Sequence, residues 1–245
     1  MPHPFELRKE LRLDATPEQV WEAIATGPGM DSWFMGRNEI EPREGGRTSL
    51  SLAGFSEGST ITAWDPPHHF AHRGDTSPDG TFMAFEWLVE GRGQGSTVVR
   101  LVQSGMLGDD WEAEYDALSE GWPMYLHSLG EYLTHFAGRV ATPVFAARPG
   151  TGPNPWAALT AALGLPDAVA AGQAVRLTPA GLPPIDGVVD YRSAHFLGVR
   201  GADGLYRFIH GLQDTAVLGH HLFTPGLDQR ETERAWQSWL DSVFS

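Results

Sequence analysis

The stretch Phe5-Glu-Leu-Arg-Lys-Glu-Leu-Arg-Leu13, followed by Asp14-Ala-Thr-Pro-Glu-Gln-Val-Trp21, decides how this chain folds at its start. Apolar and polar residues alternate in the first part, which is typical of a strand with one buried face. In the second part Thr16 can cap a helix, and Pro17 suits the first helical position because its missing N–H would be unpaired there. The sequence therefore predicts an N-terminal strand that leads directly into a capped helix.

Turn residues divide the following chain into short strands and one long helix. The first helix is expected over residues 17–24, to end near Gly27-Pro28-Gly29, and to be followed by a helical turn at 30–34. Strands are predicted at residues 47–52, 59–64, 68–73, 82–90 and 96–104. From Trp111 to Phe136, apolar side chains recur at steps of three and four, which predicts an amphipathic helix. This half therefore has an α+β pattern.

A stretch rich in proline and glycine separates this half from a smaller pattern of similar order. Residues 140–155 contain few apolar side chains, so we interpret them as a linker. Beyond them we expect a helix at 156–163, strands at 174–177, 187–191, 195–200, 205–211 and 215–223, and a final helix at 228–244. The predicted organisation is a domain at 1–139, a linker at 140–155 and a second domain at 156–245.

The second half also repeats part of the first in its residues. The matching positions are residues 45–54 on 172–181 without a gap and, in the same alignment, His68 on His195 and Arg73-Gly74 on Arg200-Gly201. Chance is one explanation of so weak a match, and a degenerate tandem copy is the other, favoured by the order of the elements. The second copy is expected to lack the first strand and therefore to complete its sheet by docking on the first domain.

Composition narrows the classes of protein that need to be considered. With 17 basic and 31 acidic residues, the formal charge of −14 argues against nucleic acid and anionic membrane surfaces as partners. The absence of cysteine excludes disulfides, thiol nucleophiles and cysteine-ligated zinc. No apolar run approaches the length of a membrane span, and the N-terminus lacks the pattern of a signal peptide. We therefore expect a cytoplasmic protein.

Several short motifs together resemble one known family. They are Asp31-Ser-Trp33, Gly45-Gly-Arg47, Gly58, Trp64-Asp-Pro-Pro67, Phe85-Glu86, Gly95-Ser-Thr97 and the helix from Trp122 to Leu133. In order and spacing they are similar to the heat-shock ATPase activator homologue (Aha-like) branch of the START-like (SRPBCC) superfamily, over residues 5–139. The resemblance implies a helix-grip fold, in which a curved antiparallel sheet wraps around a long C-terminal helix. It also implies a cavity for an apolar or amphipathic small molecule.

The alternation within the strands indicates which side chains would face such a cavity. In residues 82–90, Phe85 and Trp87 share one face and Glu86 lies on the other, while Leu101 and Gln103 share the inner face of the next strand. Gln103 would then be a buried amide in need of a partner. The candidate ligand-binding residues are Trp33, Phe34, Phe85, Trp87, Leu101, Gln103, Trp122, Tyr125 and Leu129. An ordinary filled core is the alternative interpretation.

The histidines and carboxylates do not form a recognisable metal or catalytic motif. Neighbouring residues of a strand point to opposite faces, so His68 with His69, or His220 with His221, are not expected to share a metal ion. We interpret these histidines and His72 as isolated surface or hydrogen-bonded residues. No catalytic residue, metal or cofactor is assigned.

Three functions from different classes remain open. The first is non-catalytic binding of a lipid, polyketide or aromatic metabolite. The second is an enzyme similar to polyketide cyclases, for which Gln103, Tyr115, Tyr125 and His127 are the candidate residues. The third is a protein-interaction or co-chaperone-like module whose second copy caps the first. The sequence leaves the oligomeric state open.

Overall fold

The computed structural model describes residues 1–93, 95–166 and 168–245. These residues form two compact units, Met1–Val140 and Ala141–Ser245, and each is described here by itself.

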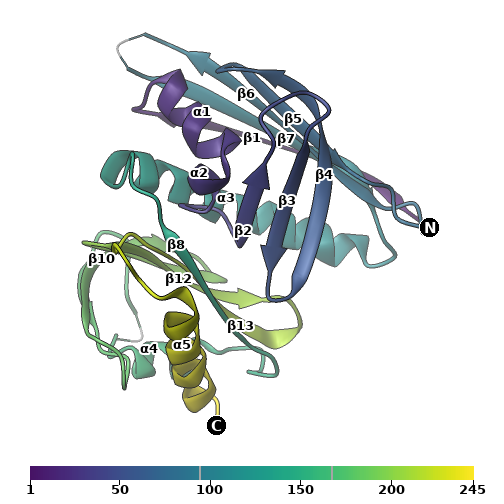
Figure 1. Ribbon diagram of the computed structural model, residues 1–245. Coiled ribbons are helices and arrows are strands. Elements are labelled where there is room, and N and C mark those ends of the chain that lie inside the picture. The colour runs from purple at the N-terminus through teal and green to yellow at the C-terminus, as the bar shows by residue number, and fades with distance from the viewer. Residues whose placement is uncertain (94, 167) are drawn as a thin grey trace. The chain divides into compact units, whose positions relative to one another are not determined.

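The first domain is one antiparallel sheet with a long helix across one face (Figure 1). Its elements are β1 (His3–Leu13), α1 (Pro17–Ala25), α2 (Gly27–Met30), β2 (Arg37–Ile40), β3 (Arg47–Leu52), β4 (Phe55–Asp65), β5 (His69–Gly74), β6 (Phe82–Gly91), β7 (Thr97–Leu107) and α3 (Trp111–His135). The strand order is β1-β7-β6-β5-β4-β3-β2, so β7, the last strand of this domain, comes back to pair with β1. Strand and helix order are those of the helix-grip fold that the family resemblance implies.

The start of the chain forms as the sequence predicts. The Gln19 backbone N–H donates to the Thr16 hydroxyl at 3.3 Å, and the Thr16 N–H donates to the Gln19 side chain at 2.9 Å. This reciprocal pair satisfies two backbone donors at the helix start. Helix α1 ends at Ala25, next to Gly27-Pro28-Gly29 as expected. The helical turn expected at 30–34 begins earlier, because Thr26 caps a second short helix, α2, that contains Gly27, Pro28 and Gly29. Proline is tolerated there because the first helical N–H groups have no partner within the helix.

The second domain is a six-stranded antiparallel sheet with its own helices. Its elements are β8 (Thr142–Arg148), α4 (Trp156–Ala162), β9 (Ala174–Leu177), β10 (Ile185–Arg192), β11 (Phe196–Gly201), β12 (Gly204–Gly211), the 3-10 turn η1 (Leu212–Asp214), β13 (Thr215–Leu222) and α5 (Gln229–Val243). The strand order is β8-β13-β12-β11-β10-β9. This is the order of the first sheet without an equivalent of β2.

The prediction that the second copy lacks its first strand is wrong. Residues 142–148, expected to lie in a linker, form β8, which pairs with β13 as β1 pairs with β7. Pro143 is compatible with this strand because β8 lies at the edge of the sheet, where one side of the backbone needs no ladder hydrogen bond. The second domain therefore supplies its own first strand.

The correspondence between the two domains extends to a local irregularity in the sheets. In the first domain the β4–β5 register shifts between Ile61 and Ala63, and in the second the β10–β11 register shifts between Val189 and Tyr191. The residue before each shift makes the same two backbone hydrogen bonds to the loop that precedes β3 or β9. These are Gly45 N to Ile61 O and Ile61 N to Gly46 O, and in the second domain Gly172 N to Val189 O and Val189 N to Gln173 O. Both sheets therefore carry a bulge at the same place, where it can redirect the side chains that follow.

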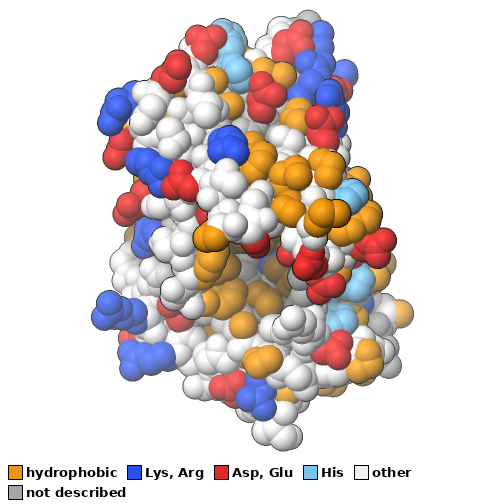
Figure 2. Space-filling view, turned by 90° about the vertical axis from the view of Figure 1, so that its right-hand side faces the viewer, with side chains coloured by type: hydrophobic (Ala, Val, Ile, Leu, Met, Phe, Trp, Pro, Cys, Tyr) orange, Lys and Arg blue, Asp and Glu red, His pale blue; other side chains and the backbone are white. Residues whose placement is uncertain are grey.

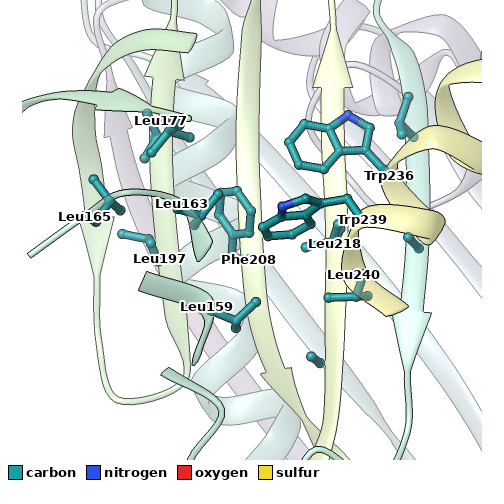
Figure 3. Packing of buried hydrophobic residues seen from close by; sticks show 14 of the residues in the cluster. Leu159, Leu163, Leu165, Leu177, Leu197, Phe208, Leu218, Trp236, Trp239 and Leu240 are labelled. Carbon is teal, nitrogen blue, oxygen red and sulfur yellow. The ribbon is translucent and has the colours of Figure 1, made fainter. Parts of the chain in front are cut away.

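The second domain has a filled core between its sheet and α5. Trp236 and Trp239 of α5 pack against Phe208 of β12 and Leu218 of β13, with leucines from α4 and β11 beside them (Figure 3). At the sheet edge, side chains of α5 also reach the backbone of β8. Ala147 N donates to the Gln237 side-chain oxygen at 3.1 Å, and the Gln237 amide donates back to Ala147 O at 3.0 Å.

The outer face of the first sheet carries charged side chains, so a site for an apolar ligand is expected on its inner face. Arg100 bridges Glu10 and Glu90 on neighbouring strands, and all three side chains are substantially exposed. Acidic and basic side chains are interspersed on the face of the molecule drawn in Figure 2.

Among the described residues, no helix combines the length and the apolar character needed to cross a membrane.

Candidate ligand-binding site

A row of five side chains crosses the inner face of the first sheet. Ile61, His72, Phe85, Gln103 and Leu7 are paired in register on β4, β5, β6, β7 and β1. Directly paired residues of antiparallel strands point to the same face, so these side chains lie side by side. We call them the central row. Ile61, Gln103 and Leu7 are buried, while His72 and Phe85 are only partly buried.

Gln103 is turned inward, as its position in the strand predicts, and it has a protein partner. The indole N–H of Trp122, on α3, donates to the Gln103 side-chain oxygen at 2.6 Å, and both residues are buried. The Gln103 amide nitrogen lies 3.4 Å from the sulfur of Met83, which is a weak acceptor. The Trp122 bond therefore fixes the height of α3 above the central row.

An aromatic cluster joins α3 to the central row. Phe34 stacks on Trp122 with ring centroids 5.6 Å apart and lies 5.0 Å from Tyr125, while Phe85 lies 6.3 Å from Trp122. The segment after α2, strand β6 and helix α3 thus each contribute rings to one cluster. Of these four rings, only that of Trp122 belongs to a fully buried residue, and Phe34, Phe85 and Tyr125 remain partly accessible.

The other candidate residues are packed inside the domain. Trp33, Trp87, Leu101 and Leu129 are all at most 2% exposed, so they have no free surface to offer a ligand. Trp33 also donates its indole N–H to the backbone oxygen of Ala23 at 2.9 Å, which ties it to α1. Partial access thus distinguishes Phe34, Phe85 and Tyr125 from the rest of the candidate set.

Two polar side chains of this region have no hydrogen-bond partner among the described residues: His72 and, on α3, Tyr125. Burial lowers the pKa of His72 to about 4 and raises the pKa of Tyr125 above its ordinary value. At neutral pH the imidazole is therefore uncharged and the phenol keeps its proton. Both groups can form hydrogen bonds without bringing a charge into an apolar site.

Sequence reasoning missed His72 as a residue of this face. The interpretation as a surface or hydrogen-bonded histidine is wrong for His72, although it holds for His69, whose ring lies 2.9 Å from the Glu86 carboxylate. The available signal was the period of two in β5, since His72 shares its face with the buried Phe70.

The second domain has different side chains at the equivalent positions, and two of them are buried. Val199 is paired with Val189 and Tyr206, so it takes the place that His72 has between Ile61 and Phe85. On the helix, Trp236 and Trp239 repeat the spacing of Trp122 and Tyr125. Val199 and Trp239 are both buried, in contrast to His72 and Tyr125. At these two positions the second domain is more deeply buried than the first, whereas Tyr206, the counterpart of Phe85, is partly buried as Phe85 is.

The comparisons with known proteins agree with a helix-grip domain. Residues 14–134 match the family described as Activator of Hsp90 ATPase homolog 1-like protein. The first domain of this chain belongs to that family, within the START-like (SRPBCC) class of folds.

Solved structures resemble this chain at low sequence identity. The di-domain ARO/CYC BexL, from the BE-7585A biosynthetic pathway, is 14% identical, with 97% of this chain and 94% of that chain covered and a TM-score of 0.48. Protein MLL2253 of Mesorhizobium loti is 21% identical, covering 54% of this chain and 98% of its own, with a TM-score of 0.48. The Aha1 dimer of Colwellia psychrerythraea is 19% identical, with 53% and 96% covered and a TM-score of 0.44. Among curated proteins, none matches this chain.

Proposed function

We propose that the first domain binds a hydrophobic or amphipathic small molecule, such as a lipid, polyketide or aromatic metabolite, between its sheet and α3. One observation carries this proposal: Phe34, Phe85 and Tyr125 lie on the inner side of the domain but stay partly accessible. Apolar walls with a few polar groups are typical of small-molecule sites. A ligand that buries about 200 Å² of apolar surface there would gain about 5 kcal/mol.

The ionisation of the nearby groups supports binding rather than acid–base catalysis by Tyr125. Burial raises the pKa of Tyr125, so its phenol is a weaker acid than in water and acts at neutral pH as a hydrogen-bond donor. Gln103, another residue considered for catalysis, is engaged by Trp122. We therefore favour a site that holds its ligand without transforming it.

A filling substitution tests whether the central row borders open space. In Phe85→Trp the larger ring should occupy that space and weaken binding of the neutral fluorescent probe N-phenyl-1-naphthylamine at least tenfold. The free energy of unfolding should change by less than about 1 kcal/mol, because overpacking an already filled core typically costs about 1–3 kcal/mol. Leu88→Trp is the matched control, since Leu88 lies on the outer face of the same strand and is exposed.

Two results would contradict the proposal when they occur together. One is a wild-type protein that does not bind the probe, and the other is a Phe85→Trp variant that loses about 1–3 kcal/mol of stability. That combination means that the row is ordinary core. If instead the probe binds, native mass spectrometry of the protein purified from its own host would identify a co-purified ligand.

A further inference from the structure

His72 holds an unusual position for a histidine. Its ring stacks on Phe85, with centroids 4.9 Å apart and planes 20° from parallel, and lies 5.3 Å from the ring of Phe70. On its other side β4 presents the apolar Ile61 in register. Nδ1 is buried, and no described residue hydrogen-bonds to either ring nitrogen. A polar ring is therefore set among apolar side chains with its hydrogen-bonding capacity unused.

An unused buried nitrogen is costly for the folded protein. A buried polar atom without a partner loses the hydrogen bonds that water gave it in the unfolded chain, and most such atoms in folded proteins have partners. The second domain has Val199 at the equivalent position, so the fold itself does not require a polar residue there. Only Nδ1 is sealed in this way, so Nε2 is the ring atom at which a partner from outside the protein would give this histidine a role.

We propose that His72 is the polar anchor of the inner face and that it selects ligands whose apolar body carries a hydroxyl group. This inference rests on the proposed function, because it assigns the chemistry of the molecule bound there. A neutral imidazole offers one lone pair as acceptor and one N–H as donor, and a hydroxyl group complements either. An aromatic body would extend the stack that His72 already forms with Phe85.

The neighbouring polar groups are less suited to this selection. The oxygen of Gln103 is engaged by Trp122, and its amide faces the Met83 sulfur. Tyr125 lies on α3 and keeps its proton, so it offers mainly a donor and would favour a carbonyl or ether oxygen. Among the described residues of the inner face, the imidazole is thus the group best matched to a hydroxyl donor.

The test compares two probes of similar shape, 2-naphthol and 2-methylnaphthalene, bound to the chain of residues 1–245. The measured quantity is the ratio of two dissociation constants, that of 2-naphthol divided by that of 2-methylnaphthalene. This ratio should be roughly 2- to 12-fold lower in the wild type than in His72→Phe, because one net hydrogen bond provides that range. His69→Phe is the matched control, because His69 lies on the outer face of the same strand and pairs with Glu86. It should keep the wild-type ratio of affinities.

The two proposals can fail separately. Equal ratios in the wild type and in His72→Phe, with both probes bound, overturn the role of His72 and leave ligand binding intact. Binding of neither probe overturns the role of His72, and together with a Phe85→Trp variant that loses about 1–3 kcal/mol of stability it overturns ligand binding as well. Because His72→Phe could disturb folding, nitrogen-15 NMR of the wild-type imidazole provides a second test. 2-Naphthol should shift a ring nitrogen resonance of His72, whereas an equal shift with 2-methylnaphthalene contradicts the hydrogen bond.

Discussion

The bond between Trp122 and Gln103 predicts a strong coupling between these two residues. Gln103→Met keeps the length of the side chain but leaves the buried Trp122 indole N–H without its acceptor, which lies at 2.6 Å. An orphaned buried donor costs about 1–3 kcal/mol. Trp122→Phe leaves the Gln103 oxygen unpaired and also removes ring contacts with Phe34 and Trp87, so we expect a loss of about 2–4 kcal/mol.

The double variant distinguishes this bond from simple packing. When both polar partners are replaced by apolar groups, no buried group is left unpaired, so the loss should be smaller than the sum of the single losses by about 1–2 kcal/mol. The assay is urea unfolding of the full chain, followed by circular dichroism and fluorescence, with all four proteins at the same pH. Single losses that add to within about 0.5 kcal/mol would refute the reasoning, because residues that do not interact behave additively.

Two further predictions concern histidine protonation and a crowded glycine. Burial lowers the pKa of His220 to about 3, from an ordinary value of 6.5, so the unfolded chain takes up this proton first. The neutral His220 therefore contributes to the free energy of unfolding in full above pH 6.5, and this contribution is lost as the pH falls toward 3. At pH 5 about 2 kcal/mol of it has been lost. Urea midpoints at pH 7 and pH 5 should therefore differ less in His220→Leu than in the wild type, and an identical pH dependence would rule out this origin. Gly46→Ala should destabilise more than Gly45→Ala, as thermal melts would show, because a Cβ at Gly46 would lie 2.5 Å from Glu41 O, whereas Gly45 has open space and only its positive φ of 73° to accommodate. A larger loss at Gly45 would contradict the crowding argument.

The elements with strong local patterns could be predicted from the sequence. The alternation before Leu13 and the cap at Thr16 establish β1 and α1, and the spacing from Trp111 onward establishes α3. The second helical turn was expected at 30–34, whereas α2 begins at Gly27, because Gly27 and Pro28 usually end helices although both are tolerated in a first turn. Strand β8 was missed because its neighbours are rich in proline and glycine, and its identity depends on pairing with the distant β13.

The candidate site could be predicted only in part. Period two in the strands correctly turned Gln103 and Phe85 inward. It could not indicate that Trp33 and Trp87 would be sealed while Phe34 and Tyr125 stay accessible, since that depends on how α3 and the segment after α2 pack on the sheet. His72 could have been placed by the same period of two, which puts it on the inner face of β5 with Phe70 and puts His69 on the outer face.

The side chains with which α5 reaches β8 have a consequence for association with other chains. An edge strand normally exposes backbone donors and acceptors that can recruit a strand from another molecule. Here Gln237 occupies both backbone groups of Ala147, and the carboxylate of Glu233 accepts from Phe145 N at 3.4 Å. The side chains of α5 therefore occupy backbone groups of β8 with which an incoming strand would pair. Loss of α5 would both remove the core tryptophans and open a template for aggregation.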